Sequence, residues 1–132
     1  MTKRNLVNLD AAPVTYTIMG ISSHENDYRI SWSINEQLGL TFVQNENLVT
    51  ADGREFTCFA HEDDHQTLLL ISNRCDNGFL LEKHKNIDFI LKFNNELNET
   101  ETAEWLHNLK NVSLISAIFT ITVNKKILQM LK

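Results

Sequence analysis

The chain has 132 residues, the usual size of a single domain. Its apolar fraction of 42% and charged fraction of 22% are ordinary for a globular protein, which excludes a largely disordered chain. The net charge of −5 argues against a general nucleic-acid binder, because such proteins usually carry a basic face. We therefore expect one domain over residues 1–132 that binds no nucleic acid.

No segment of the sequence has the character of a targeting or membrane segment. The basic start, Met1–Arg4, is not followed by an apolar stretch long enough for a signal peptide. The longest uninterrupted apolar run, Leu68–Ile71, is far too short to span a bilayer. We expect a cytoplasmic protein with no membrane association. Cys58 and Cys75 should then stay reduced, and their spacing is neither a zinc nor a redox motif.

The first part of the chain predicts a strand followed by a helix. A polar leader, about residues 1–12, precedes a stretch rich in β-formers at 14–21. Ser22-Ser23-His24-Glu25 then has the pattern of a capping box, with a serine at the N-cap and a glutamate three residues later. The helix should continue to about Leu38, and Gly39 is typical of the left-handed residue that ends a helix.

The middle of the chain predicts antiparallel strands joined by turns. Asp52-Gly53 is a hairpin turn between a strand near Val49 and a strand over 55–60. The polar segment His61–Gln66 should be an exposed connection to a strand over 67–73. The next strand, 87–93, alternates with its apolar side chains on one face, namely Ile87, Phe89, Leu91 and Phe93.

The last third predicts a helix over about 99–110, a strand over 112–123, and a frayed tail over about 124–132. Alternation along the strand places Phe119 and Ile121 on one face. We expect a single core beneath the two helices, formed by Phe89, Leu91, Phe93, Phe119 and Ile121. The side chains of Trp32 and Trp105 also fall on expected core faces.

This order of elements predicts an α+β fold. Two strand–helix–strand units flank several antiparallel strands, which indicates an antiparallel or mixed sheet with two helices packed on one face. A ferredoxin-like sandwich with an extra hairpin is the specific topology that we expect.

Several short motifs resemble a bacterial family named for its IPExxxVDY motif. They are Gly20–His24, Asp27–Arg29, Leu38–Leu40, Asn73-Arg74 and Gly78–Leu80. The naming motif falls on Leu81-Glu82-Lys83 and Ile87-Asp88-Phe89, where only Asp88 is identical, glutamate replaces proline and lysine replaces glutamate. The resemblance covers about residues 14–121. It implies a stand-alone small bacterial domain and no particular activity.

One segment matches the zinc-protease pattern HExxH, namely His61-Glu62-Asp63-Asp64-His65. That chemistry requires a helix, so that both histidines bind one zinc ion and the glutamate acts as a base. Here the flanking residues are typical of strands, and a third ligand would have to be the distant Glu82. We expect a polar hairpin loop, and a small metal-dependent hydrolase built on His61, Glu62 and His65 remains the alternative.

The remaining candidate site is the loop at the start of the first helix. Ser22, Ser23 and His24, helped by Arg29 or Arg74, are suited to binding a small anion, because helix N-termini carry free N–H groups and a positive dipole end. The alternative is that Ser22 only caps the helix and His24 is exposed. We expect a non-enzymatic binding or interaction module without a cofactor, and a homodimer is one arrangement that the sequence allows.

Overall fold

The computed structural model describes residues 15–131 of the chain. Its helices are α2 (Asp27–Leu38), α3 (Glu99–Lys110) and α4 (Lys125–Met130). Its strands are β2 (Ile18–Ser22), β3 (Val43–Gln44), β4 (Leu48–Val49), β5 (Glu55–Phe56), β6 (Cys58–Glu62), β7 (Thr67–Ser72), β8 (Arg74–Cys75), β9 (Gly78–Phe79), β10 (Phe89–Phe93) and β11 (Ala117–Ile121). The expected leader over 1–12 lies outside the described residues.

Six of the strands form one sheet in the order β11-β2-β10-β7-β6-β3, and every neighbouring pair is antiparallel. Two small hairpins, β4-β5 and β8-β9, stand beside it. The expected α+β class with an antiparallel sheet is therefore confirmed. The ferredoxin-like topology stays a prediction: β11, β2, β10 and β7 lie side by side in that order, and β6 and β3 extend the sheet beyond them.

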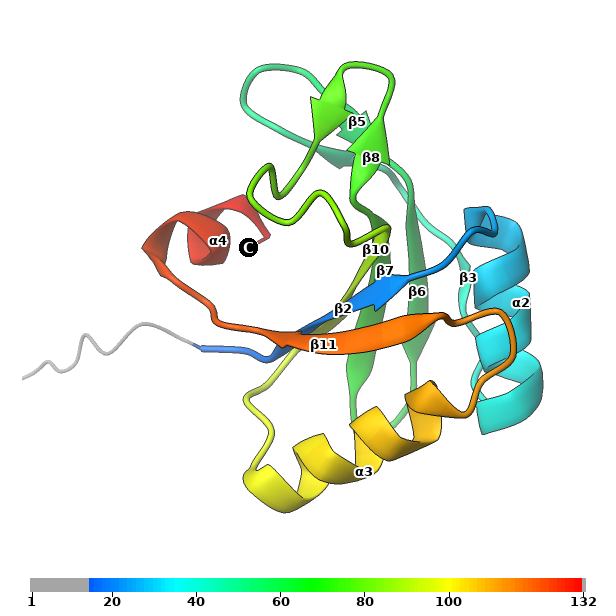
Figure 1. Ribbon diagram of the computed structural model, residues 1–132. Helices are drawn as coiled ribbons and strands as arrows, with labels where there is room; N and C mark the ends of the chain where they lie inside the picture. The colour runs from blue at the N-terminus through cyan, green and yellow to red at the C-terminus, as the bar shows by residue number, and fades with distance from the viewer. Residues whose placement is uncertain (1–14, 132) are drawn as a thin grey trace, which may run out of the picture.

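Each face of the sheet carries its own core, and Figure 1 shows α3 on one side of the sheet and α4 on the other. Beneath α2 and α3 lie the apolar side chains Met19, Ile21, Leu70 and Leu91 together with the helix residues that cover them. On the other face, Ile18, Ile71 and Ile90 pack with Ile127 of α4. The two long helices thus share a face, as the sequence predicts.

The C-terminal tail is not frayed over its described part. Asn124 caps α4 by accepting a hydrogen bond from Ile127 N at 2.9 Å. Tyr16 donates its hydroxyl to the carbonyl of Ile127 at 2.9 Å, and Ile127 and Leu131 are buried. The tail is helical because these two side chains close the second core, a tertiary contact that a short polar sequence does not reveal.

The single core expected beneath the helices is correct for Phe89, Leu91 and Phe93 and wrong for Phe119 and Ile121. Phe119 pairs with Gly20 and Ile121 pairs with Ile18, so both point to the face that α4 covers. Ile121 is buried there, whereas Phe119 is 39% exposed. The side chains of β11 alternate as predicted, but Phe119 and Ile121 lie on the sheet face opposite the expected one.

Helix α2 begins later and faces another way than the sequence suggests. Its N-cap is Asn26, which accepts a hydrogen bond from Arg29 N, so the capping box assigned to Ser22 is wrong. Gly39 ends the helix with a φ of 67°, as expected. Trp32 is 58% exposed, because Ile30, Ile34 and the small serines between them face the sheet.

No helix within residues 15–131 combines the length and the apolar character that crossing a membrane requires.

Candidate functional site

Asp88 connects two of the regions that the sequence suggested for a site. Its Oδ2 atom accepts a hydrogen bond from Ser23 N at 2.8 Å, and its Oδ1 atom lies 2.5 Å from Arg74 Nη2. The contact arises because Asp88 directly precedes β10, which pairs with β2 just before Ser23 and with β7 just before Arg74. The loop after β2 and the arginine on β8 therefore meet at one carboxylate.

The two serines of the loop have structural partners. Ser22 donates its hydroxyl to the carbonyl of Asn86 at 2.6 Å. Ser23 donates its hydroxyl to the carbonyl of Leu114 at 2.6 Å and accepts a hydrogen bond from Glu25 N at 3.1 Å. Ser22 belongs to β2, so its side chain fastens a strand end and does not cap the helix.

Three of the five suggested residues line a common cleft of about 600 Å³, namely Ser23, His24 and Arg74. Arg29 is not among its lining residues: it extends along the surface of α2 and forms an ion pair with Glu25 at 3.0 Å. We name this depression, which lies between the start of α2 and the β8 strand, the Asp88 cleft.

The charge of the Asp88 cleft is mainly negative. Five carboxylates line it, namely Glu25, Asp27, Glu55, Asp76 and Asp88. The only arginine or lysine among the lining residues is Arg74, which is paired with Asp88. The cleft is therefore suited to a cationic group.

The start of α2 offers little to an anion. The N–H groups of Tyr28 and Arg29 are bound by the side chains of Asp27 and Asn26. A helix N-terminus attracts anions through its free N–H groups, and here side chains of the same helix already occupy them. Anion binding by this loop stays a prediction, and these hydrogen bonds count against it.

The HExxH segment has no helical geometry. His61 is buried near the end of β6, and its Nδ1 atom accepts a hydrogen bond from Thr41 N at 3.0 Å. That assignment leaves the proton on Nε2, which donates to Asp63 Oδ2 at 2.9 Å. This hydrogen bond is the main reason why the pKa of Asp63 is lowered. Both ring nitrogens are thus in use.

Of the predicted exposed connection His61–Gln66, residues 62–65 are exposed, Gln66 is half-buried and His61 is buried, and the first two residues belong to β6. Among residues 15–131, no three His, Cys, Asp or Glu side chains are arranged as a metal site. Glu62 and His65 are both exposed. The geometry therefore gives the hydrolase alternative no support.

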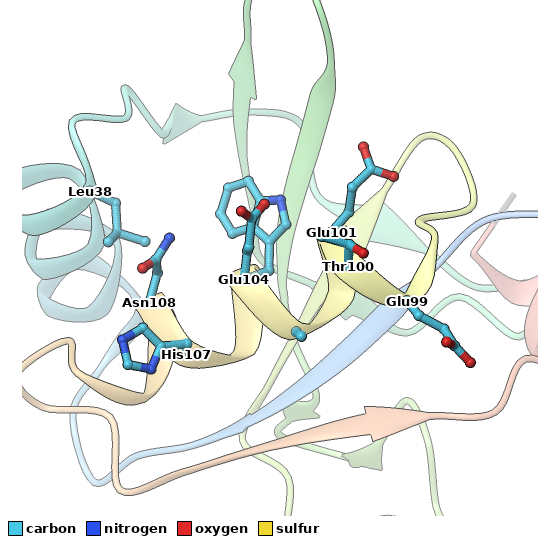
Figure 2. Close-up of a pocket in the computed structure, with 9 residues that line it drawn as sticks. Leu38, Glu99, Thr100, Glu101, Glu104, His107 and Asn108 are labelled. Carbon is cyan, nitrogen blue, oxygen red and sulfur yellow. The ribbon is translucent and has the colours of Figure 1, made fainter.

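A broader groove runs along α3 next to Leu38 and measures about 960 Å³. Its floor includes Trp105, whose ring packs edge-on against Phe93 with centroids 5.1 Å apart. Glu101 and Glu104 point to one side of the helix, whereas Glu99 and His107 point to the other (Figure 2). These polar groups do not converge on a common point, so the groove has no evident chemistry.

The sequence matches no protein-family model and no curated protein. The resemblance to the IPExxxVDY family consequently stays a hypothesis.

Proposed function

We propose that the protein is a non-enzymatic binding module whose Asp88 cleft takes a positively charged group of a partner, such as the guanidinium of an arginine side chain. The observation that carries the proposal is the set of five carboxylates in one depression, whose only arginine or lysine is already paired with Asp88. The two reduced cysteines support the cytoplasmic location that we include in this proposal, and the resemblance to the IPExxxVDY family supports a bacterial origin.

Burial gives Asp88 the largest part in this recognition. Its side chain is only 17% exposed, whereas that of Arg74 is 57% exposed. Exposed ion pairs contribute about 0–1 kcal/mol each, and partly buried ones are screened less. An incoming guanidinium can replace Arg74 beside Asp88, so no additional charge has to be buried. Glu55 and Asp76, at the rim, would attract the cation before it reaches Asp88.

The proposal is tested by titrating the ¹⁵N-labelled protein with a short arginine-rich peptide and recording amide shifts. We expect saturable shifts at Ser23, His24 and Cys75 that weaken as salt is raised. The double variant Glu55→Gln, Asp76→Asn should bind several-fold more weakly. The matched control, Glu101→Gln with Glu104→Gln, removes the same charge from α3, outside the cleft, and should bind like the wild type.

Two results would contradict this proposal. Equal binding by the two double variants would mean that the peptide responds only to the net charge of the molecule. Shifts of the Ser23 and His24 amides on addition of inorganic phosphate, without a response to the peptide, would instead favour the anion site that the sequence suggested.

The structure offers an edge for the homodimer that the sequence allows. Strand β11 ends the six-stranded sheet, so its outward N–H and C=O groups pair with no other strand of residues 15–131 and can accept another strand. The segment from Val112 to Val123 has no charged residue, and Phe119 is exposed in its centre. We infer that β11 of a second copy pairs with it, because identical uncharged strands do not repel each other.

A further inference from the structure

A second cleft lies on the sheet face opposite α2 and α3. It measures about 680 Å³ and is formed by the turn of the β4-β5 hairpin, the loop after β9, and α4. Figure 1 shows α4 and this loop on the other side of the sheet from α3. Three segments far apart in the sequence thus meet here. The volume is within the range of about 300–1,000 Å³ that small-molecule sites occupy.

The rim of this cleft is basic in an acidic protein. Arg54, Lys83, Lys85 and Lys126 line it, which are four of the nine lysines and arginines among residues 15–131, against two carboxylates. Arg54 forms an ion pair with Asp52, with its Nε atom 3.0 Å from Asp52 Oδ2. The three lysines form no ion pair with any of the described residues, and because Asp52 is paired with Arg54, Glu82 is the one carboxylate of the lining left to offset them.

The floor of the cleft is apolar. Leu81 and Ile127 are 4% and 6% exposed and belong to the second core, and Met130 lies partly buried beside them. Tyr16 fixes the position of α4 through its hydrogen bond to Ile127, so this floor is held in place. A methionine can adapt its shape to a bound hydrocarbon, because its side chain is unbranched and flexible.

We propose that this basic cleft binds a small amphipathic anion, a molecule with a carboxylate or phosphate head and an unbranched hydrocarbon body. The head would lie among Lys83, Lys85 and Lys126, where three ammonium groups can donate charge-assisted hydrogen bonds. The body would pack against Met130 and over Leu81 and Ile127, and the gain would come from removing its own hydrocarbon surface and the exposed part of Met130 from water. The Asp88 cleft and its proposed partner play no part in binding this anion, so each proposal can be tested independently of the other.

The experiment is an isothermal titration with decanoate and with decyl phosphate, both kept below their micelle concentrations. Decanol supplies the same body without the charge, and inorganic phosphate supplies a head without the body. We expect one equivalent of either anion to bind, with amide shifts confined to 50–54, 80–85 and α4. Decanol should bind about tenfold more weakly or worse, the loss expected when a charged head loses its hydrogen bonds.

Lys125 and Lys126 are neighbours in α4, but only Lys126 lines the cleft, which allows a matched control. Lys126→Gln with Lys83→Gln removes two charges from the rim and should weaken binding of decanoate about tenfold or more. Lys125→Gln with Lys110→Gln removes the same charge from positions that do not line the cleft, and should leave the affinity unchanged. Equal affinities for decanoate and decanol would overturn the proposal, as would equal affinities of the two double variants or shifts centred on α3. Failure of either anion to bind would also overturn it.

Discussion

The side chain of Ile87 lies directly over Gly20, in the space that a side chain on residue 20 would need. A β-carbon there would stand 2.9 Å from Ile87 Cγ1 and closer still to Ile87 Cδ1. Gly20 is in the middle of β2, paired with Ile90 on one side and Phe119 on the other. Hydrogen bonding to a strand on each side therefore resists any movement of β2 away from Ile87.

Gly20→Ala should lower the free energy of unfolding by about 1–3 kcal/mol, the usual cost of overpacking a core. Urea unfolding of the purified variant measures this loss. Ile87→Val removes the Cδ1 atom that makes the closest contact, so the double variant should be more stable than the sum of the single losses predicts. Strict additivity would show that Ile87 does not occupy this space.

A second prediction separates two phenylalanines that the sequence places in one core. Phe93 is fully buried, so Phe93→Ala should cost about 3–5 kcal/mol. Phe119 is 39% exposed, and its replacement by alanine should cost about 1 kcal/mol, the range of changes near a surface. Chemical unfolding of both variants measures the two values. Equal losses would place Phe119 in a closed core and contradict the register of β11.

The case of Phe119 shows what periodicity can and cannot reveal. Alternation correctly groups Phe119 with Ile121, because side chains of a strand alternate whatever lies above it. It does not say which face lies beneath the helices, and here both faces carry a core. From the sequence alone we expect helices on one face of the sheet only, and the cover that α4 gives to the other face is not predicted. Helix α4 covers the second face because Ile127 packs into its core, and such a tertiary contact cannot be predicted from a local sequence pattern.

The candidate sites show the same limit. The sequence suggested Ser23, His24 and Arg74 as members of one anion site at a helix start, and the structure places these three in the lining of one cleft. Asp88, whose carboxylate links Ser23 to Arg74, was noted only through the resemblance. The basic cleft was missed altogether, although Lys83-His84-Lys85 hinted at it, because its third lysine comes from α4. Strand order and helix docking place these groups, and neither is a local property.

A third prediction concerns Asn73, which is fully buried. Its amide nitrogen donates to the carbonyls of His84 and Ile87 at 3.0 and 2.9 Å, and its Oδ1 accepts from Leu81 N at 2.7 Å. Asn73→Ala leaves the buried Leu81 N–H and the buried Ile87 carbonyl without these partners, at a cost of about 1–3 kcal/mol for each, whereas the His84 carbonyl still accepts from Ile87 N at 3.0 Å. Hydrogen exchange should show lost protection at Leu81 first. Unchanged exchange over 80–88 would mean that other contacts hold this loop.

A fourth prediction concerns pH and Tyr16. Burial raises the pKa of its phenol above the ordinary value of 10.0. The folded state therefore keeps this proton at a pH where the unfolded chain loses it. Its contribution is fully present below about pH 10 and is lost as the pH rises through the raised pKa.

Tyr16→Phe removes the hydrogen bond to Ile127 and should cost about 1 kcal/mol near neutral pH. The stability difference between wild type and variant should shrink above pH 10.0, where the tyrosinate becomes unfavourable. Unfolding curves of both proteins at several pH values measure it. Burial also lowers the pKa of Lys92 and raises the pKa of Cys58, and subtracting the two curves removes most of their contributions. A difference that stays constant up to strongly alkaline pH would place the hydroxyl in solvent.

The last prediction tests the pairing of two copies through β11. A strand of five residues is only about 17 Å long, so its pairing alone gives a small interface that should dissociate on dilution. Light scattering after size exclusion should show dimers at high concentration and monomers at low concentration. Phe119→Lys places equal charges opposite each other across the two-fold axis and should leave a folded monomer, because this side chain is already partly exposed.

Val43→Lys is the matched control, since Val43 is 64% exposed on β3 at the other edge of the sheet. Loss of the dimer in Val43→Lys alone would move the interface to β3, and a wild type that stays monomeric at every concentration would exclude the dimer.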